Sequence, residues 1–199
     1  MKMKRHNNLK AAVALILCAF IVLSGISTET AFAANKKIPL KVKFNGAEVS
    51  LIKDIYVDTD NLIPLLSSLK KKWGTPKIDK HDGDWSSYTW KKGKTRIEVN
   101  NWAFFAGAME KEDDIMSGGS FSIKDKNASV WGVKVGMTKD AALKKIKKAL
   151  GIKKVYKTYE SGVCIVAKKK SIEVWTDVSY PVTFELKNGK VTCISWLRS

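Results

Sequence analysis

The stretch VTFELKNGKVTCISW, residues 182–196, alternates apolar and polar side chains on both sides of Asn188-Gly189. Asn-Gly fits a two-residue type I′ turn, in which both central residues have positive φ. The stretch therefore predicts two paired antiparallel strands near the end of the sequence. A second stretch, KVKFNGAEVSL (41–51), has the same pattern around Asn45-Gly46 and predicts a second hairpin.

Two segments between these hairpins have the period of an amphipathic helix, and they align when 77 is added to the numbers of the first. Asn61 and Thr138 begin them, and each offers a side-chain oxygen to the free amides of a first helical turn. A glycine ends each segment, because glycine readily adopts the left-handed conformation found after a helix. The aligned positions are Leu65, Leu66, Leu69, Trp73 and Gly74 in the first segment, and Ala142, Leu143, Ile146, Leu150 and Gly151 in the second.

A strand-like stretch follows each helical segment. KGKTRIEV (92–99) and KKKSIEV (168–174) both have the composition of a short turn followed by a strand. The correspondence favours an internal duplication. We therefore predict an α+β fold of two repeated units side by side, each with a helix packed on a small antiparallel sheet.

The boundaries of these units follow from the alignment. We expect the first α+β unit, with its N-terminal hairpin, over residues 34–105 and the second over 129–199. Residues 106–128 are expected to connect them, because Gly118 and Gly119 indicate a loop.

Residues 1–33 have the features of a signal peptide. The basic start MKMKRHNNLK (1–10) precedes the apolar run AAVALILCAFIVL (11–23), and the small-residue sequence AFA ends at Ala33. The apolar run is shorter than the roughly twenty residues that a membrane-spanning helix needs. We predict cleavage near Ala33, a secreted protein that is extracellular or associated with the cell wall, and no transmembrane segment in the mature chain.

The chain is strongly basic. Its formal charge of +17 falls by three, to +14, when residues 1–33 are removed with their four basic residues and one acidic residue. Basic surfaces interspersed with aromatic side chains are typical of proteins that bind polyanions. Export disfavours nucleic acid, so we expect an anionic cell-wall polymer or an extracellular protein as the partner. The candidate binding residues are Trp85, Tyr88, Trp90, Trp102, Lys144, Lys147 and Lys148.

These candidates have simpler explanations, which the sequence leaves open. Lysines commonly cover the solvent-exposed side of a helix, and lysines late in a helix also suit its negative end. Tyr88 and Trp90 lie two residues apart and share one face of the expected strand, and aromatic residues in that position are more often part of a core.

The sequence offers little for catalysis or metal binding. His81 is the only histidine after the signal peptide, and it lies in DKHDGDW (79–85), where Asp82-Gly83 favours an ordinary turn. No glutamate closes a calcium loop, and no phosphate loop, dinucleotide-binding motif or zinc-ligand spacing occurs. We predict that the protein is not an enzyme and has no metal site and no cofactor.

Two cysteines remain after the signal peptide. An even number in an exported protein permits one disulfide, here between Cys164 and Cys193. Both lie in apolar, strand-like runs, so two buried free thiols are the alternative.

Two parts of the chain resemble known families. FNGAEVSL (44–51), NLIPLLSSLKKKWG (61–74) and YTWKKGKTRIEV (88–99) resemble the copper amine oxidase N-terminal-like domain over about residues 38–105. This resemblance implies a non-catalytic module of secreted proteins, without copper chemistry.

WGVKVGMTKDAALKKIKKALG (131–151) and the strands after it resemble the repeat of beta-lactamase-inhibitor-like proteins and outer-membrane assembly lipoproteins over about residues 131–197. In that repeat a GMT sequence opens a helix that precedes a small sheet. The resemblance implies a tandem of such units and protein binding through the sheet face.

The sequence thus predicts a secreted, non-catalytic binding module that contacts an anionic cell-wall polymer or a protein through its basic, aromatic-bearing surface. An inhibitor of an extracellular enzyme is the first alternative, and a secreted hydrolase is the second.

Overall fold

About half of the described residues belong to two antiparallel β-sheets. The structure, a computed structural model, describes residues 37–56, 65–80, 85–102, 118–177 and 179–198. The large sheet has eight strands in the order β3 (Lys77–Lys80), β4 (Trp85–Lys92), β5 (Thr95–Trp102), β6 (Gly118–Ile123), β11 (Lys190–Arg198), β10 (Ser179–Lys187), β9 (Ser171–Thr176) and β8 (Cys164–Ala167). The small sheet has three strands in the order β2 (Ala47–Ile52), β1 (Leu40–Phe44) and β7 (Ala128–Val130).

Both predicted hairpins are confirmed. β1 pairs with β2 around Asn45 (φ 50°) and Gly46 (φ 87°), and β10 pairs with β11 around Asn188 (φ 51°) and Gly189 (φ 70°). The positive φ values at both central positions are those of the type I′ turn that Asn-Gly favours.

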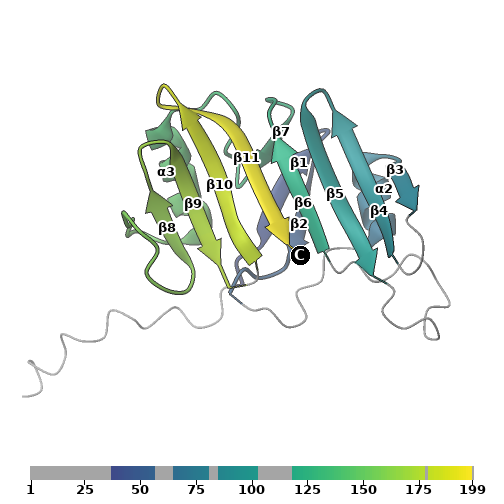
Figure 1. Ribbon diagram of the computed structural model, residues 1–199, viewed down its shortest axis with the longest axis horizontal. Helices are drawn as coiled ribbons and strands as arrows, with labels where there is room; N and C mark the ends of the chain where they lie inside the picture. The colour runs from purple at the N-terminus through teal and green to yellow at the C-terminus, as the bar shows by residue number, and fades with distance from the viewer. Residues whose placement is uncertain (1–36, 57–64, 81–84, 103–117, 178, 199) are drawn as a thin grey trace, which may run out of the picture. The chain divides into compact units, whose positions relative to one another are not determined.

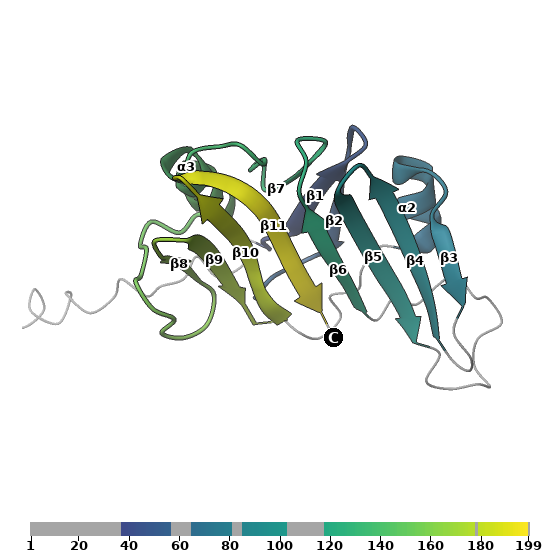
Figure 2. The ribbon, with the colours of Figure 1, turned by 45° about the horizontal axis from the view of Figure 1, so that its top comes forward.

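Two helices and the small sheet lie on the same face of the large sheet (Figures 1 and 2). The helices are α2 (Leu66–Trp73), near β3 and β4, and α3 (Lys139–Leu150), near the β8 end of the sheet. Neither described helix has the length and apolar character that a bilayer-spanning helix needs.

The core lies between the large sheet and the elements that cover it. Trp90, Ile97, Phe121 and Trp196 lie side by side in register across β4, β5, β6 and β11, and all four are buried. Burying side chains of this size contributes roughly 1.5–3 kcal/mol each.

Helix α3 has the ends and the apolar stripe that the sequence predicts. The Ala141 amide donates to Oγ1 of Thr138 (3.4 Å), and Gly151 ends the helix with φ 72°. Its buried residues, Ala142, Ile146 and Leu150, face the core.

Helix α2 is shorter and begins at Leu66. Leu65 occupies its N-cap position without a side-chain hydrogen bond, and the expected cap Asn61 lies outside the described residues. Leu66, Leu69 and Trp73 are buried.

The predicted α+β fold of two repeated helix-on-sheet units is wrong. The described residues are mainly β, with two short helices, and eight strands share one sheet. β6 joins the halves, because it pairs with β5 on one side and with β11 on the other. Gly118 and Gly119, expected in a connecting loop, begin this strand. A Cβ at Gly118 would lie 3.1 Å from the Arg198 carbonyl oxygen, so close backbone approach accounts for the glycine there.

Candidate anion-binding pocket

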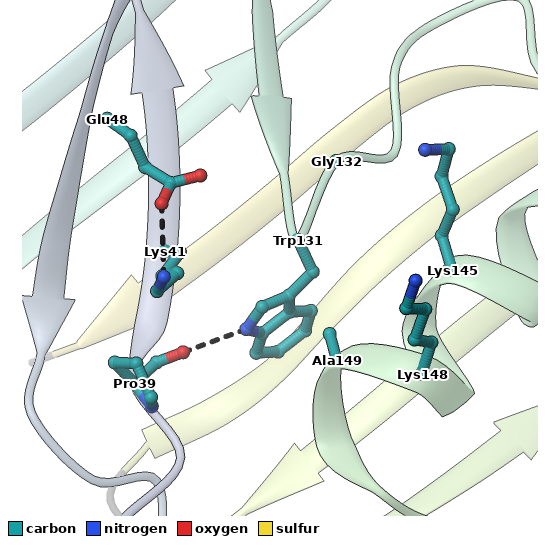
Figure 3. A pocket seen from close by; sticks show the side chains of 8 residues that line it. All are labelled: Pro39, Lys41, Glu48, Trp131, Gly132, Lys145, Lys148 and Ala149. Carbon is teal, nitrogen blue, oxygen red and sulfur yellow. Dashed lines mark hydrogen bonds and ion pairs between the residues drawn. The ribbon is translucent and has the colours of Figure 1, made fainter.

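A pocket of about 410 Å³ lies between the small sheet and α3 (Figure 3). Strands β1 and β2 form one side, the turn after β7 forms the back, and one face of α3 forms the other side. The lining residues are Pro39, Lys41, Glu48, Trp131, Gly132, Lys145, Lys148 and Ala149. Three lysines and one glutamate give this lining a formal charge of +2.

The turn at the back of the pocket consists of Trp131 and Gly132. Both have positive φ, 49° and 74°, and the flanking residues Val130 and Val133 exchange two backbone hydrogen bonds of 3.1 and 2.8 Å. Positive φ is uncommon for a bulky residue such as tryptophan, so the surrounding contacts must hold this conformation.

Trp131 has three such contacts. Its amide donates to the Lys41 carbonyl (3.1 Å), its indole Nε1 donates to the Pro39 carbonyl (2.9 Å), and its ring packs on Phe184 at 6.5 Å between centroids. The side chain is 7% exposed. The indole therefore forms a fixed, mainly apolar wall whose only polar group is already bonded.

Gly132 lies close to the α3 lysine opposite. A Cβ at this position would lie 3.6 Å from Nζ of Lys145. The amide of Gly132 donates to no carbonyl among the described residues. The turn therefore has an unused N–H group in a residue that neighbours the Lys145 ammonium.

Lys145 and Lys148 extend from α3 into the pocket (Figure 3). They are three positions apart and so occupy neighbouring places on one helix face, where like charges repel. The small side chain of Ala149 lies beside them in the lining. Within the described part of the chain, no carboxylate lies within ion-pair distance of either lysine. Two uncompensated positive charges therefore share one pocket, and a bound anion would offset them.

Lys41 differs from these two lysines because it has a carboxylate partner. Its Nζ lies 3.2 Å from Oε1 of Glu48, across the β1–β2 pair, and both side chains are about half exposed, at 47% and 49%. An exposed pair of this kind contributes about 0–1 kcal/mol. It can therefore open at little cost when a ligand enters.

Only one of the three lysines predicted as binding residues lines the pocket. Lys148 lines the pocket, whereas Lys144 and Lys147 do not. Lys145, Lys41 and Trp131 line it and were missed. The spacing of Lys145 and Lys148 on one face of the helix was a usable signal, but their position opposite β1 depends on pairing between distant strands.

The aromatic surface expected from the sequence is not formed by Tyr88 and Trp90. Their side chains are 4% and 3% exposed, because they lie on the covered face of the large sheet. Nε1 of Trp90 donates to the Gly74 carbonyl (2.7 Å). Trp85 and Trp102 are opposite each other in the β4–β5 pair, and their side chains lie outside the described residues.

Cys164 and Cys193 are free, buried thiols. They lie on β8 and β11, with β9 and β10 between them, so about 14 Å separates their strands at roughly 4.8 Å per strand. A disulfide needs Cα atoms within about 7 Å. The bond that the sequence permits is therefore not formed. The pKa of each thiol is raised, mainly by burial. A raised pKa reduces the fraction of thiolate, the reactive form of cysteine.

Among the described residues, no group of three or more histidine, cysteine, aspartate or glutamate side chains could hold a metal ion. His81 lies outside those residues.

Comparison with known proteins finds no matching family model, no matching curated protein and no matching solved structure.

Proposed function

We propose that the protein is an exported, non-catalytic binding module for an anionic cell-wall polymer, and that Lys145 and Lys148 are its principal contacts. One observation carries the proposal: two lysines without a carboxylate partner, among the residues described, point into a pocket with a formal charge of +2. The signal-peptide features of residues 1–33 support a partner outside the cell.

The chemistry of the site suits attraction at low ionic strength. Ammonium groups beside an apolar wall attract anions through charge, and salt screens this attraction over about 8–10 Å at physiological ionic strength. The rest of the positive surface would draw a polymer toward the protein without selecting a position on it.

An enzyme inhibitor finds less support. An inhibitor that binds through the sheet face should expose a cluster of Trp85, Tyr88, Trp90 or Trp102 there. Tyr88 and Trp90 are buried, and the side chains of Trp85 and Trp102 lie outside the described residues. The other face of the large sheet also carries charged residues that pair with one another. Glu98 pairs with Arg96, and Glu173 pairs with Lys168, so these charges already have partners within the chain.

The proposal is tested by measuring how much purified protein sediments with isolated cell walls as salt increases. We expect binding at low salt that falls steeply at higher salt. The double variant Lys145→Gln/Lys148→Gln should bind about tenfold more weakly, because two lost contacts at roughly 0.7 kcal/mol each amount to about 1.4 kcal/mol.

Lys144→Gln/Lys147→Gln is the matched control, because it removes the same charge from the same helix outside the pocket. It should change affinity by less than about twofold if screening limits long-range attraction. Equal losses in the two variants would contradict a role for the pocket. Absence of wall binding at low salt, or binding that salt leaves unchanged, would contradict the proposed function.

A further inference from the structure

The lining of the pocket includes three hydrogen-bond donors from two elements. Lys145 and Lys148 approach from α3, and the unused amide of Gly132 belongs to the turn after β7. The Lys145 ammonium lies close to the backbone of the turn. A Cβ placed on Gly132 would be 3.6 Å from Nζ of Lys145.

We propose that these three donors form a subsite for one phosphate group. This inference rests on the proposed function and narrows its ligand from an anionic polymer to a phosphate-bearing one. Lysine is a common phosphate ligand that acts as a point charge, whereas arginine is favoured where a planar group must be gripped by two parallel bonds. No arginine lines the pocket.

The geometry favours phosphate over carboxylate. The oxygens of a tetrahedral phosphate point in several directions, so donors on a helix and on a separate turn can each reach one. A phosphate has four oxygens at tetrahedral corners, of which a monoester leaves three unesterified and a diester two, whereas a carboxylate has two oxygens in one plane and therefore offers acceptors over a narrower range of directions. Backbone amides in turns commonly take part in phosphate binding.

Charge and size also match. A phosphate monoester carries about −1.5 to −2 at pH 7 and a diester carries −1, so either is compensated by the two unpaired lysines. A pocket of about 410 Å³ is near the lower end of small-molecule sites, which span roughly 300–1,000 Å³. It accommodates one phosphate and an adjoining small unit, and the Trp131 wall provides an apolar surface for the carbon atoms of that unit.

The phosphate can come from within a polymer or from a small phosphorylated molecule, and the experiment includes both sources. Calorimetric titrations at low salt would use poly(glycerol phosphate), polyglutamate of matched length as the carboxylate polymer, glycerol 3-phosphate and inorganic phosphate. We expect poly(glycerol phosphate) to bind at least about tenfold more tightly than polyglutamate.

The Gly132 amide gives a direct second measurement. Its resonance in a ¹⁵N-edited NMR spectrum should shift on addition of glycerol 3-phosphate, because phosphate accepts from this amide. Lys145→Gln/Lys148→Gln should abolish the shift and the phosphate preference, whereas Lys144→Gln/Lys147→Gln should preserve both. The remaining resonances report whether each variant is folded.

The outcomes separate this inference from the proposed function. If both polymers bind equally and the Gly132 resonance does not move, the phosphate subsite is overturned and polymer binding stands. If glycerol 3-phosphate shifts Gly132 but neither polymer nor walls bind, the subsite stands and the wall-polymer function is overturned. If no probe and no wall preparation binds at low salt, both proposals fail.

Discussion

The two described helices have similar apolar stripes but use their lysines differently. In α2, Lys72 donates to the Glu48 carbonyl (3.2 Å), and Nε1 of the adjacent Trp73 donates to the Ala47 carbonyl (3.2 Å). Both acceptors belong to β2, the edge strand of the small sheet. In α3, by contrast, Lys145 and Lys148 have no carboxylate partner among the described residues and face the pocket.

Under the proposed function, the same amphipathic pattern serves stability in α2 and binding in α3. On α2, Lys72 satisfies the Glu48 carbonyl of the edge strand, which would otherwise be open to another strand. On α3, Lys145 and Lys148 contribute charge to a cavity, although Lys139 at the start of the helix donates to the Lys168 carbonyl (2.8 Å) beside the large sheet. The number of lysines on a helix does not indicate which role the helix has. The groups that those lysines contact do indicate it.

Loss of Trp73 should produce the largest effect. Its ring contacts Phe44 of the small sheet and Trp90 of the large sheet at 5.9 and 5.6 Å between centroids, so it links both sheets to α2. We expect Trp73→Ala to lower the free energy of unfolding by about 3–5 kcal/mol. Urea denaturation would measure this loss.

The milder variant Trp73→Phe keeps an aromatic ring but removes the bond to the Ala47 carbonyl. It should lose clearly less stability than Trp73→Ala. If Trp73→Ala costs under about 1 kcal/mol, the residue is not the link between the sheets that its contacts indicate.

The sequence predicted what depends on neighbouring residues. Asn45-Gly46 and Asn188-Gly189 determine two-residue turns, and Thr138 and Gly151 determine the ends of α3, because each acts within a few residues of itself. These parts required no knowledge of the partner elements.

The sequence did not predict which distant strands pair. β6 and β11 are about seventy residues apart, and Phe121 lies opposite Trp196 only because the sheet is continuous. The double glycine at the start of β6 favoured a loop on local grounds. The pocket also depends on the pairing of distant strands, because β1 pairs with β7 and this brings Lys41 near α3. Lys148 was therefore identified as one of several helix lysines, without its position in a pocket.

Substitutions at the helix ends should change the free energy of unfolding by an intermediate amount, and they provide a second test of the comparison. Thr138 caps α3, whereas Leu65 at the start of α2 has no capping side chain and is 49% exposed. Thr138→Ala should lower the free energy of unfolding by about 1 kcal/mol, and Leu65→Ser should raise it by about 0.5–1 kcal/mol. Thermal or urea denaturation would measure both.

Thr138→Ser is the control for the first substitution, because it retains the capping oxygen. A loss in Thr138→Ser equal to that in Thr138→Ala would show that the methyl group, and not the cap, stabilises α3. A loss of stability in Leu65→Ser would contradict the view that α2 lacks a favourable cap.

Substitution of single lysines on the two helices should have the smallest effects on stability. Lys72→Met removes the bond to the Glu48 carbonyl and should cost about 0.5 kcal/mol. Lys148→Met removes a positive charge that lies three and four residues after Lys145 and Lys144, so it should leave stability unchanged or raise it by up to about 0.5 kcal/mol. Methionine keeps a flexible stem of similar length in both cases.

Salt separates these two effects, because they have different physical origins. At 1 M salt the screening length falls to about 3 Å, so a gain from Lys148→Met through reduced repulsion should disappear. The loss in Lys72→Met arises from a hydrogen bond at 3.2 Å and should largely remain. Urea midpoints of both variants at low and high salt would test this. If Lys148→Met loses as much stability as Lys72→Met at both salt concentrations, Lys148 has a structural role like that of Lys72, and the contrast between the helices does not hold.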